Sequence, residues 1–258
     1  MALRLTDIAG EGILLLGGAR AILLQVAHPA VGRGVTRHSD FAADRLKRLR
    51  NTLTYIYVVV YGTDDEVARV TSAVNAAHQH VTGDGYDAAD AQLQLWVAAT
   101  LYESAATLYE RIFGPLTPDD AESIYRDYAK LGTALQVPQD AWPPAVDSFQ
   151  RYWADASEKW CTTPETLVLC DELLGVRNIP AWLRLGMPLV RLVTTGLLTP
   201  QLRVMYQLPW SPSRQRRFDF ALRVIAVVVP RIPKRIRNWP RDHYLAQFRA
   251  RSRAEPRA

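Results

Sequence analysis

Apolar residues along most of this chain recur at steps of three and four, which is the spacing of a helix that buries one face. Alternating patterns typical of strands are scarce, and prolines and glycines fall between helical segments of 12 to 25 residues. We therefore predict an all-α fold, a single globular domain of about ten helices around a buried pocket. The helices are expected near residues 6–28, 43–61, 64–82, 90–113, 118–135, 139–159, 164–173, 179–198, 212–229 and 240–252.

The helix boundaries are clearest around residues 62–83. Gly62 is expected to end one helix, and Thr63–Glu66 (TDDE) has capping-box spacing with acids in the first turn. Gly83 is a suitable C-terminal stop for the helix that follows. Within that helix one apolar stripe consists of Val67, Val70, Val74, His78 and Val81.

The stripe distinguishes the two histidines of this segment. His78 lies on it and points inward, whereas His80, two residues on, lies about 200° around the helix and faces water. Two side chains so placed cannot bind one metal, which excludes a paired-ligand site. His78 is then either a hydrogen-bonded core residue or a ligand, and Asn75 and Thr82 place polar groups beside it.

The preceding helix carries a polar line. Arg48, Asn51, Thr52 and Tyr55 stand at i, i+3, i+4 and i+7. One interpretation is an exposed polar face. The helix continues into the apolar IYVVVY of residues 56–61, so we expect part of the line to face a cavity.

The first predicted helix is apolar apart from Arg20, Gln25 and His28. An interior arginine requires an anionic partner, because an unpaired buried charge is costly. Glu103 could serve, and so could a bound propionate or phosphate.

A tight irregular loop is expected to follow, because Pro29 and two glycines precede His38. His28 and His38 are separated by ten residues across that loop, which fits no standard metal site.

Charge is unevenly distributed. Residues 201–258 hold thirteen Arg and one Lys against three acids, or +11, which leaves −6 for residues 1–200 of the total +5. We expect this basic end to fold back onto the acidic body or to contact a membrane surface peripherally. Nucleic acid is a less favoured partner, because groove-reading motifs are missing.

Other features narrow the class of protein. No uncharged apolar run reaches the ~18 residues of a spanning helix, and 48% hydrophobic residues suffice for a large core. Cys161 and Cys170 form no metal or redox motif and are expected as free thiols in a reducing cytoplasm. Nucleophile-elbow, phosphate-loop, HExxH and EF-hand motifs are missing too.

Five segments in order resemble the catalytic domain shared by the fungal MpaB oxygenases and the bacterial latex-clearing proteins, or rubber oxygenases. The resemblance covers roughly residues 10 to 235. The segments are GGARAILLQVAHPAVGRGVTRHSDF, RLKRLRNTLTYIYVVVYGT, AAHQHVTG, LQLWVAATLYESAATLYERIFGPLT and LLTPQLRVMYQLPWSPSRQRRF.

The resemblance implies an all-α fold around a non-covalently held haem b, with His78 at the position of the family's iron ligand. Arg48, Asn51 and Thr52 match a distal R-x-x-K-T line in order, with Asn51 in place of a basic residue. Thr82 stands where the rubber oxygenases carry arginine.

A further departure lies at Ala98, where many bacterial relatives carry histidine, while Glu103 matches an acid common in that helix. Arg20 or His28 would anchor a propionate or the structure. Family members act with dioxygen on isoprenoid chains or other lipophilic molecules, so the leading hypothesis is a haem b-dependent oxygenase, cytoplasmic or peripheral at a membrane.

The alternative hypothesis is a catalytically degenerate family member that binds haem or lipid or associates with a membrane. Its basis is the set of departures, together with the mixture of apolar and cationic residues in FALRVIAVVVPRIPKRIR. A final core helix with a solvated basic end would explain that segment equally. We expect the catalytic-type domain to span residues 1–235 and a basic tail to span 236–258.

Overall fold

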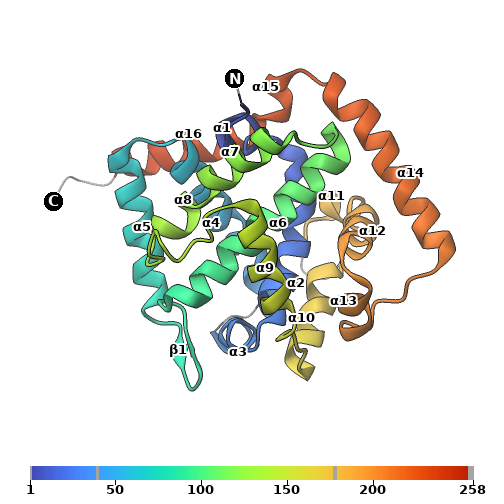
Figure 1. The fold of residues 1–258 in the computed structure, drawn as a ribbon, viewed down its shortest axis with the longest axis horizontal. Helices are drawn as coiled ribbons and strands as arrows, with labels where there is room; N and C mark the ends of the chain where they lie inside the picture. Colours follow the sequence, from blue (N-terminus) through green and yellow to red (C-terminus); the bar gives the residue numbers. More distant parts are fainter. Residues whose placement is uncertain (1, 39–40, 177–178, 255–258) are drawn as a thin grey trace.

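The computed structural model of the chain describes residues 2–38, 41–176 and 179–254. Within them the fold is all-α, as predicted, and its strands form one small hairpin (Figure 1). The helices in chain order are α1 Leu5–Ile8, η1 Gly12–Gly17, α2 Gly18–Ala27, α3 Pro29–His38, α4 Phe41–Tyr61, α5 Asp64–His78, α6 Ala91–Phe113, α7 Pro118–Tyr128, α8 Lys130–Thr133, α9 Val146–Ser157, α10 Pro164–Leu174, α11 Ala181–Arg184, α12 Met187–Leu197, α13 Pro200–Met205, α14 Pro212–Val228, η2 Val229–Arg231, α15 Lys234–Arg237 and α16 Trp239–Ala254.

Helix α6 runs through the middle of the molecule (Figure 1) and contributes to three apolar clusters. Tyr102 belongs to the first cluster, with α4 and α7. Trp96 belongs to the second, with α2 and α10, and Leu108 to the third, with α12 and α14. The surrounding helices therefore pack on α6, and the burial of these large apolar side chains stabilises that packing, because it is the dominant favourable term in folding.

Helices α4 and α5 form a hairpin whose turn follows the predicted capping box. Thr63 Oγ1 accepts from the Glu66 backbone N–H at 3.3 Å, and the Glu66 carboxylate accepts from the Thr63 N–H at 3.1 Å. The two helices then run back along each other, packed side by side.

The predicted end of α5 at residue 82 is wrong, since the helix stops at His78. A β-hairpin follows, with β1 (Thr82–Gly83) paired to β2 (Tyr86–Asp87). Between the strands Gly85 adopts a φ of +76°, which a glycine tolerates without steric cost. The Asp-Gly pair is a strong hairpin signal, and it overrides the helical period here.

The irregular loop predicted for residues 29–38 is a helix, α3. Pro29 occupies its first position, where a missing N–H costs nothing. Gly32 permits a close approach, because a Cβ there would lie 2.7 Å from the Val26 carbonyl oxygen. The glycines therefore serve packing here rather than a loop.

Several predicted helices are divided. Residues 6–28 form α1, η1 and α2, and a Cβ at Gly12 would lie 2.8 Å from the Arg237 carbonyl oxygen. Residues 118–135 form α7 and α8, and residues 179–198 form α11 and α12 around Gly186. Helix α9 begins at Val146, after Pro143 and Pro144, rather than at residue 139.

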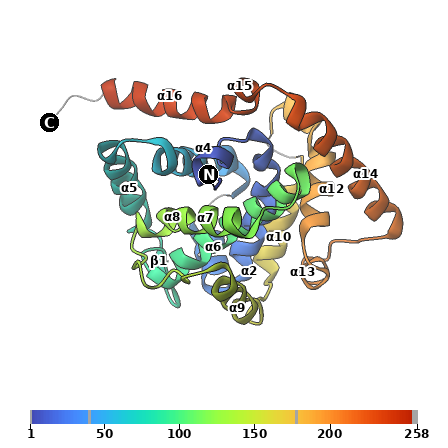
Figure 2. The same cartoon turned by 45° about the horizontal axis from the view of Figure 1, so that its top comes forward.

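The basic end of the chain folds back onto the body, which is one of the two expected alternatives. Helix α16 packs on α4 and η1 (Figure 2), and Leu245 joins the first apolar cluster. Arg249 pairs with Glu66 at 2.8 Å, and Arg237 pairs with the buried Glu11 at 2.8 Å. Residues 236–254 are therefore part of the packed structure.

Among the described residues no single helix combines the length and apolar character that crossing a membrane requires. Residues 12–27 and 29–37 meet the criterion only as a pair, with a bend of 108° between them.

Candidate functional site

His78 is the last residue of α5 and is half-buried. Its Nδ1 atom is buried and has no hydrogen-bond partner among the described residues. Burial lowers the pKa of the imidazole, and the nearby carboxylate of Asp87 acts in the opposite direction. The ring is therefore held neutral, which is the form that binds a metal. His80 is exposed, as predicted.

A chain of amides fixes the end of α5 beside His78. Asn75 Oδ1 accepts from Gln136 Nε2 at 2.8 Å, and Gln94 Oε1 accepts from the Gln136 backbone N–H at 2.9 Å. Gln94 Nε2 in turn donates to the Ala88 carbonyl at 2.9 Å. This network ties α5, the exit of the hairpin and the start of α6 together, and it satisfies the buried amide of Gln94.

Thr82 lies on strand β1 and is exposed. Because α5 ends before it, Thr82 does not continue the helical face of His78, contrary to the expected polar line. The same hairpin brings Asp87 toward His78 and places the buried Tyr86 against α3, where a Cβ on Gly34 would lie 3.2 Å from the Tyr86 ring. Arg33 of α3 also donates to the Gly85 carbonyl at 2.8 Å.

The polar line on α4 divides into two parts. Arg48, Asn51 and Thr52 are exposed, whereas Tyr55 is buried and donates to the Leu131 carbonyl at 2.7 Å. Arg48 lies thirteen residues before the end of α4, and His78 lies fourteen residues after the start of α5. At about 1.5 Å per residue, each of them lies about 20 Å along its own helix from the connection between α4 and α5.

His28 joins α2 to α3 and is half-buried. Its Nδ1 atom is also buried without a partner among the described residues. Burial lowers its pKa, and the charges of Lys159 and Arg33 add to this effect. Its ring centroid lies 6.1 Å from that of Trp96, in the second apolar cluster. His28 is therefore a second neutral, half-buried imidazole, packed in the second cluster, while the side chain of His38 lies outside the described part.

Arg20 is satisfied by protein groups. Its guanidinium donates to the Leu197 carbonyl at 3.0 Å, to Ser104 Oγ at 3.0 Å and to the carboxylate of Glu103. Its side chain is 5% exposed and that of Glu103 is 24% exposed. The structure thus provides the first of the two expected partners, the protein carboxylate. Ala98, one helical turn and a half before Glu103, is buried in the first cluster.

No group of three or more His, Cys, Asp or Glu side chains among the described residues could hold a metal ion. Cys161 is half-buried, and burial raises the pKa of the Cys170 thiol to about 12, so Cys170 is not a reactive thiolate.

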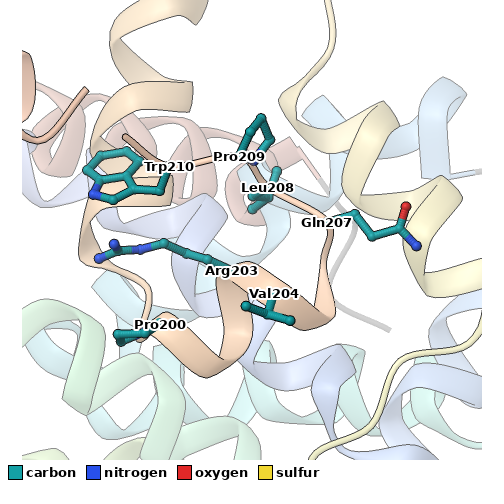
Figure 3. Close-up of a pocket in the computed structure, with 7 residues that line it drawn as sticks. All are labelled: Pro200, Arg203, Val204, Gln207, Leu208, Pro209 and Trp210. Atoms are coloured by element: carbon teal, nitrogen blue, oxygen red, sulfur yellow. The ribbon is translucent and has the colours of Figure 1, made fainter. Parts of the chain in front are cut away.

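A hollow of about 580 Å³ lies elsewhere, at the end of α13 and in the segment that follows it. Figure 3 shows Arg203 directed toward Trp210 and Gln207 directed away from them. The Arg203 guanidinium donates to the carbonyls that end α12, at residues 195, 196 and 198, and lies 4.5 Å from the Trp210 ring centroid. Its donors therefore cap a helix, and the hollow shares no lining residue with the candidate site. It is lined by Pro200, Arg203, Val204, Gln207, Leu208, Pro209 and Trp210.

Fold and site together define an all-helical protein with a neutral, half-buried histidine where two antiparallel helices meet a hairpin. The chain belongs to the family described as ER-bound oxygenase mpaB/B'/Rubber oxygenase, catalytic domain, which matches residues 6–227. Its relatives include the uncharacterized proteins Rv2237 of Mycobacterium tuberculosis and Mb2261 of Mycobacterium bovis. Each is 35% identical over 245 residues, which cover 91% of this chain and 96% of the relative. No solved structure matches the chain.

The helical period did not indicate the residues that brace His78. Gln94 and Gln136 are 42 positions apart, and their pairing depends on the packing of distant segments. Asp87 could have been found from the Asp-Gly turn signal, because a hairpin at residues 82–87 returns the chain toward the end of α5.

Proposed function

We propose that this protein is a haem b-dependent oxidoreductase, an oxygenase that acts on a lipophilic small molecule, with His78 as the iron ligand. Membership of the oxygenase family supports the reaction class. The observation that carries the cofactor assignment is the buried, unpartnered Nδ1 atom on a neutral imidazole at the position matching the family's ligand. A buried polar atom without a partner is uncommon in a finished site, which fits a group that is completed by a ligand.

The chain's own residues have defined tasks in this proposal. His78 binds the iron, and Asp87 increases the basicity of its ring by electrostatic attraction. Arg48 and Thr52 lie on the neighbouring helix α4 with exposed side chains, and in this proposal they contact the bound dioxygen. Bound haem supplies the dioxygen chemistry, and the protein supplies binding, orientation and exclusion of water.

The first experiment is the absorption spectrum of the purified protein in its ferric, ferrous and carbon monoxide-treated forms. We expect a Soret band that shifts with carbon monoxide, which indicates an open coordination position. A protein with no Soret band, even after reconstitution with haem, would refute the cofactor assignment.

The ligand assignment is tested with matched histidine variants. His78→Ala should lose the native haem spectrum, while His28→Ala should keep it, and His80→Ala serves as the surface control. Both His78 and His28 have an unpartnered buried Nδ1, so burial alone does not separate them. A normal spectrum in His78→Ala together with a changed spectrum in His28→Ala would transfer the ligand role to His28.

The oxygenase assignment needs a separate measurement. Dioxygen uptake should depend on an added lipophilic alkene, such as a short polyisoprenoid. Arg48→Ala and Thr52→Ala should lower that uptake while leaving the haem spectrum in place. Asn51→Lys adds the basic residue that the resemblance places there, and it should raise the uptake.

A second candidate function is haem or lipid binding without catalysis. The exposure of Arg48, Asn51 and Thr52 supports it, because an oxygenase is expected to exclude water around its reacting groups. A protein that binds haem but takes up no dioxygen with any lipophilic substrate would favour this candidate.

A further inference from the structure

Helix α14 has two apolar faces. Its inner face packs against α6 and α12 and carries Phe218 and Leu222, and Val229, directly after the helix, joins the same cluster. Large apolar side chains also cover the opposite face: Phe220, Val224, Val227 and Val228 are 64%, 45%, 55% and 48% exposed. At 100° per residue these four lie within one stripe about 100° wide, opposite the buried face.

None of the described elements covers the outer face. Helix α14 forms one edge of the molecule in both views, with no element outside it (Figures 1 and 2). Two further exposed apolar side chains follow along the chain, Ile236 and Trp239, which are 64% and 60% exposed. A tryptophan in such a position is typical of the boundary between lipid and water.

Cations flank this surface. Six exposed cations lie between residues 212 and 241. The one acid in this segment is Asp219, whose carboxylate accepts a hydrogen bond from Gln215 Nε2 at 2.8 Å. By the helical period, Arg216 and Arg223 lie along one side of the stripe, and Arg217 lies in line with it, one turn before Phe220. The exposed cations are Arg216, Arg217, Arg223, Arg231, Lys234 and Arg235.

We propose that this surface, the outer face of α14 with Ile236 and Trp239, docks on the surface of an anionic lipid bilayer. Its apolar stripe would enter the interface while the arginines contact lipid phosphates. A second copy of the chain is a poorer occupant, because a two-fold contact through this face would bring cations against cations. Nucleic acid would satisfy the arginines but leave Phe220 and the valines without apolar contacts.

The test is flotation of the purified full chain with vesicles of neutral lipid and with vesicles containing an anionic phospholipid. We expect binding to the anionic vesicles that weakens with salt, and little binding to the neutral ones. Haem loading is not needed for this experiment, so its outcome is independent of the proposed oxygenase function.

Two sets of variants separate the apolar and charged contributions. The double variant Phe220→Gln, Val224→Gln should abolish flotation. The control is Val168→Gln, Val176→Gln, which changes two exposed valines on α10 and just after it, and this variant should float like the wild type. Replacing three of the flanking arginines by glutamine should weaken binding about a hundredfold, at about 1 kcal/mol per cation and 1.4 kcal/mol per tenfold. Thermal unfolding monitors that each variant is folded, which exposed positions should permit.

Several results would overturn the proposal. One is wild-type protein that stays with the unbound fraction, and another is a Phe220→Gln, Val224→Gln variant that floats as well as the wild type. A third is a wild-type dimer in light scattering that the same two substitutions convert to a monomer, which would assign the surface to self-association.

Discussion

Replacement of Arg20 by methionine should strongly destabilise the protein. The substitution keeps most of the side-chain volume but removes the charge and all three hydrogen bonds of the guanidinium. It leaves the Glu103 carboxylate, 24% exposed, without its cation, and the Ser104 hydroxyl and Leu197 carbonyl without a donor. Removing one partner of a buried ion pair costs about 3–5 kcal/mol in the free energy of unfolding.

For a chain of this length that cost lowers the melting temperature by about 10 °C. The measurement is urea unfolding followed by circular dichroism, with thermal scans in parallel. The double variant Arg20→Met, Glu103→Met should recover most of the loss, because it removes the unpaired charge as well. A single variant within about 1 kcal/mol of wild type would refute the reasoning, since it would show that Glu103 is solvated well enough to stand alone.

Two further predictions concern packing and protons. Gly196→Ala should cost about 2 kcal/mol in the free energy of unfolding, because its Cβ would lie 2.3 Å from the Phe218 ring. The control is Gly18→Ala, where no atom lies within 4 Å of the new Cβ, and it should be neutral or stabilising. If both variants changed the urea midpoint equally, the predicted clash at Gly196 would be contradicted. Burial keeps the pKa values of His28 and His78 below those of the unfolded chain. As the pH is lowered from about 7.5 to 5.5, the unfolded chain therefore binds more protons than the folded one, and the free energy of unfolding should fall. Urea midpoints across this range should change less in the His28→Gln, His78→Gln variant, and an unchanged slope would contradict the assignment.

The helices with local signals are the ones that the sequence predicted well. The capping box at Thr63 fixes the start of α5, and Gly114 and the Thr117 cap bound α6 and α7. Those features depend on residues within one turn of each other. Helix α3 was missed because Gly32 and Gly34 suggest a loop locally, whereas their use is contact with distant backbone and with Tyr86.

The candidate site was predictable only in part. Helical phase placed His78 toward the interior, and its half-buried ring agrees with that direction. The exposure of Arg48 could not be read from the helical period, because the period gives the face of α4 and not the elements that cover it. The choice of Glu103 as the partner of Arg20 required the contact between α2 and α6, which joins residues 83 positions apart.

The packing of α16 also bears on the order in which the chain can fold. Synthesis proceeds from the N-terminus, so Tyr57 and Glu66 emerge long before their partners Tyr244 and Arg249. Until α15 and α16 emerge, Glu11 lacks the Arg237 cation and the first cluster lacks Leu245. The family match ends at residue 227, ahead of all these partners. Residues 236–254 thus act as a closing segment, and the nascent domain reaches its full stability only after they have emerged.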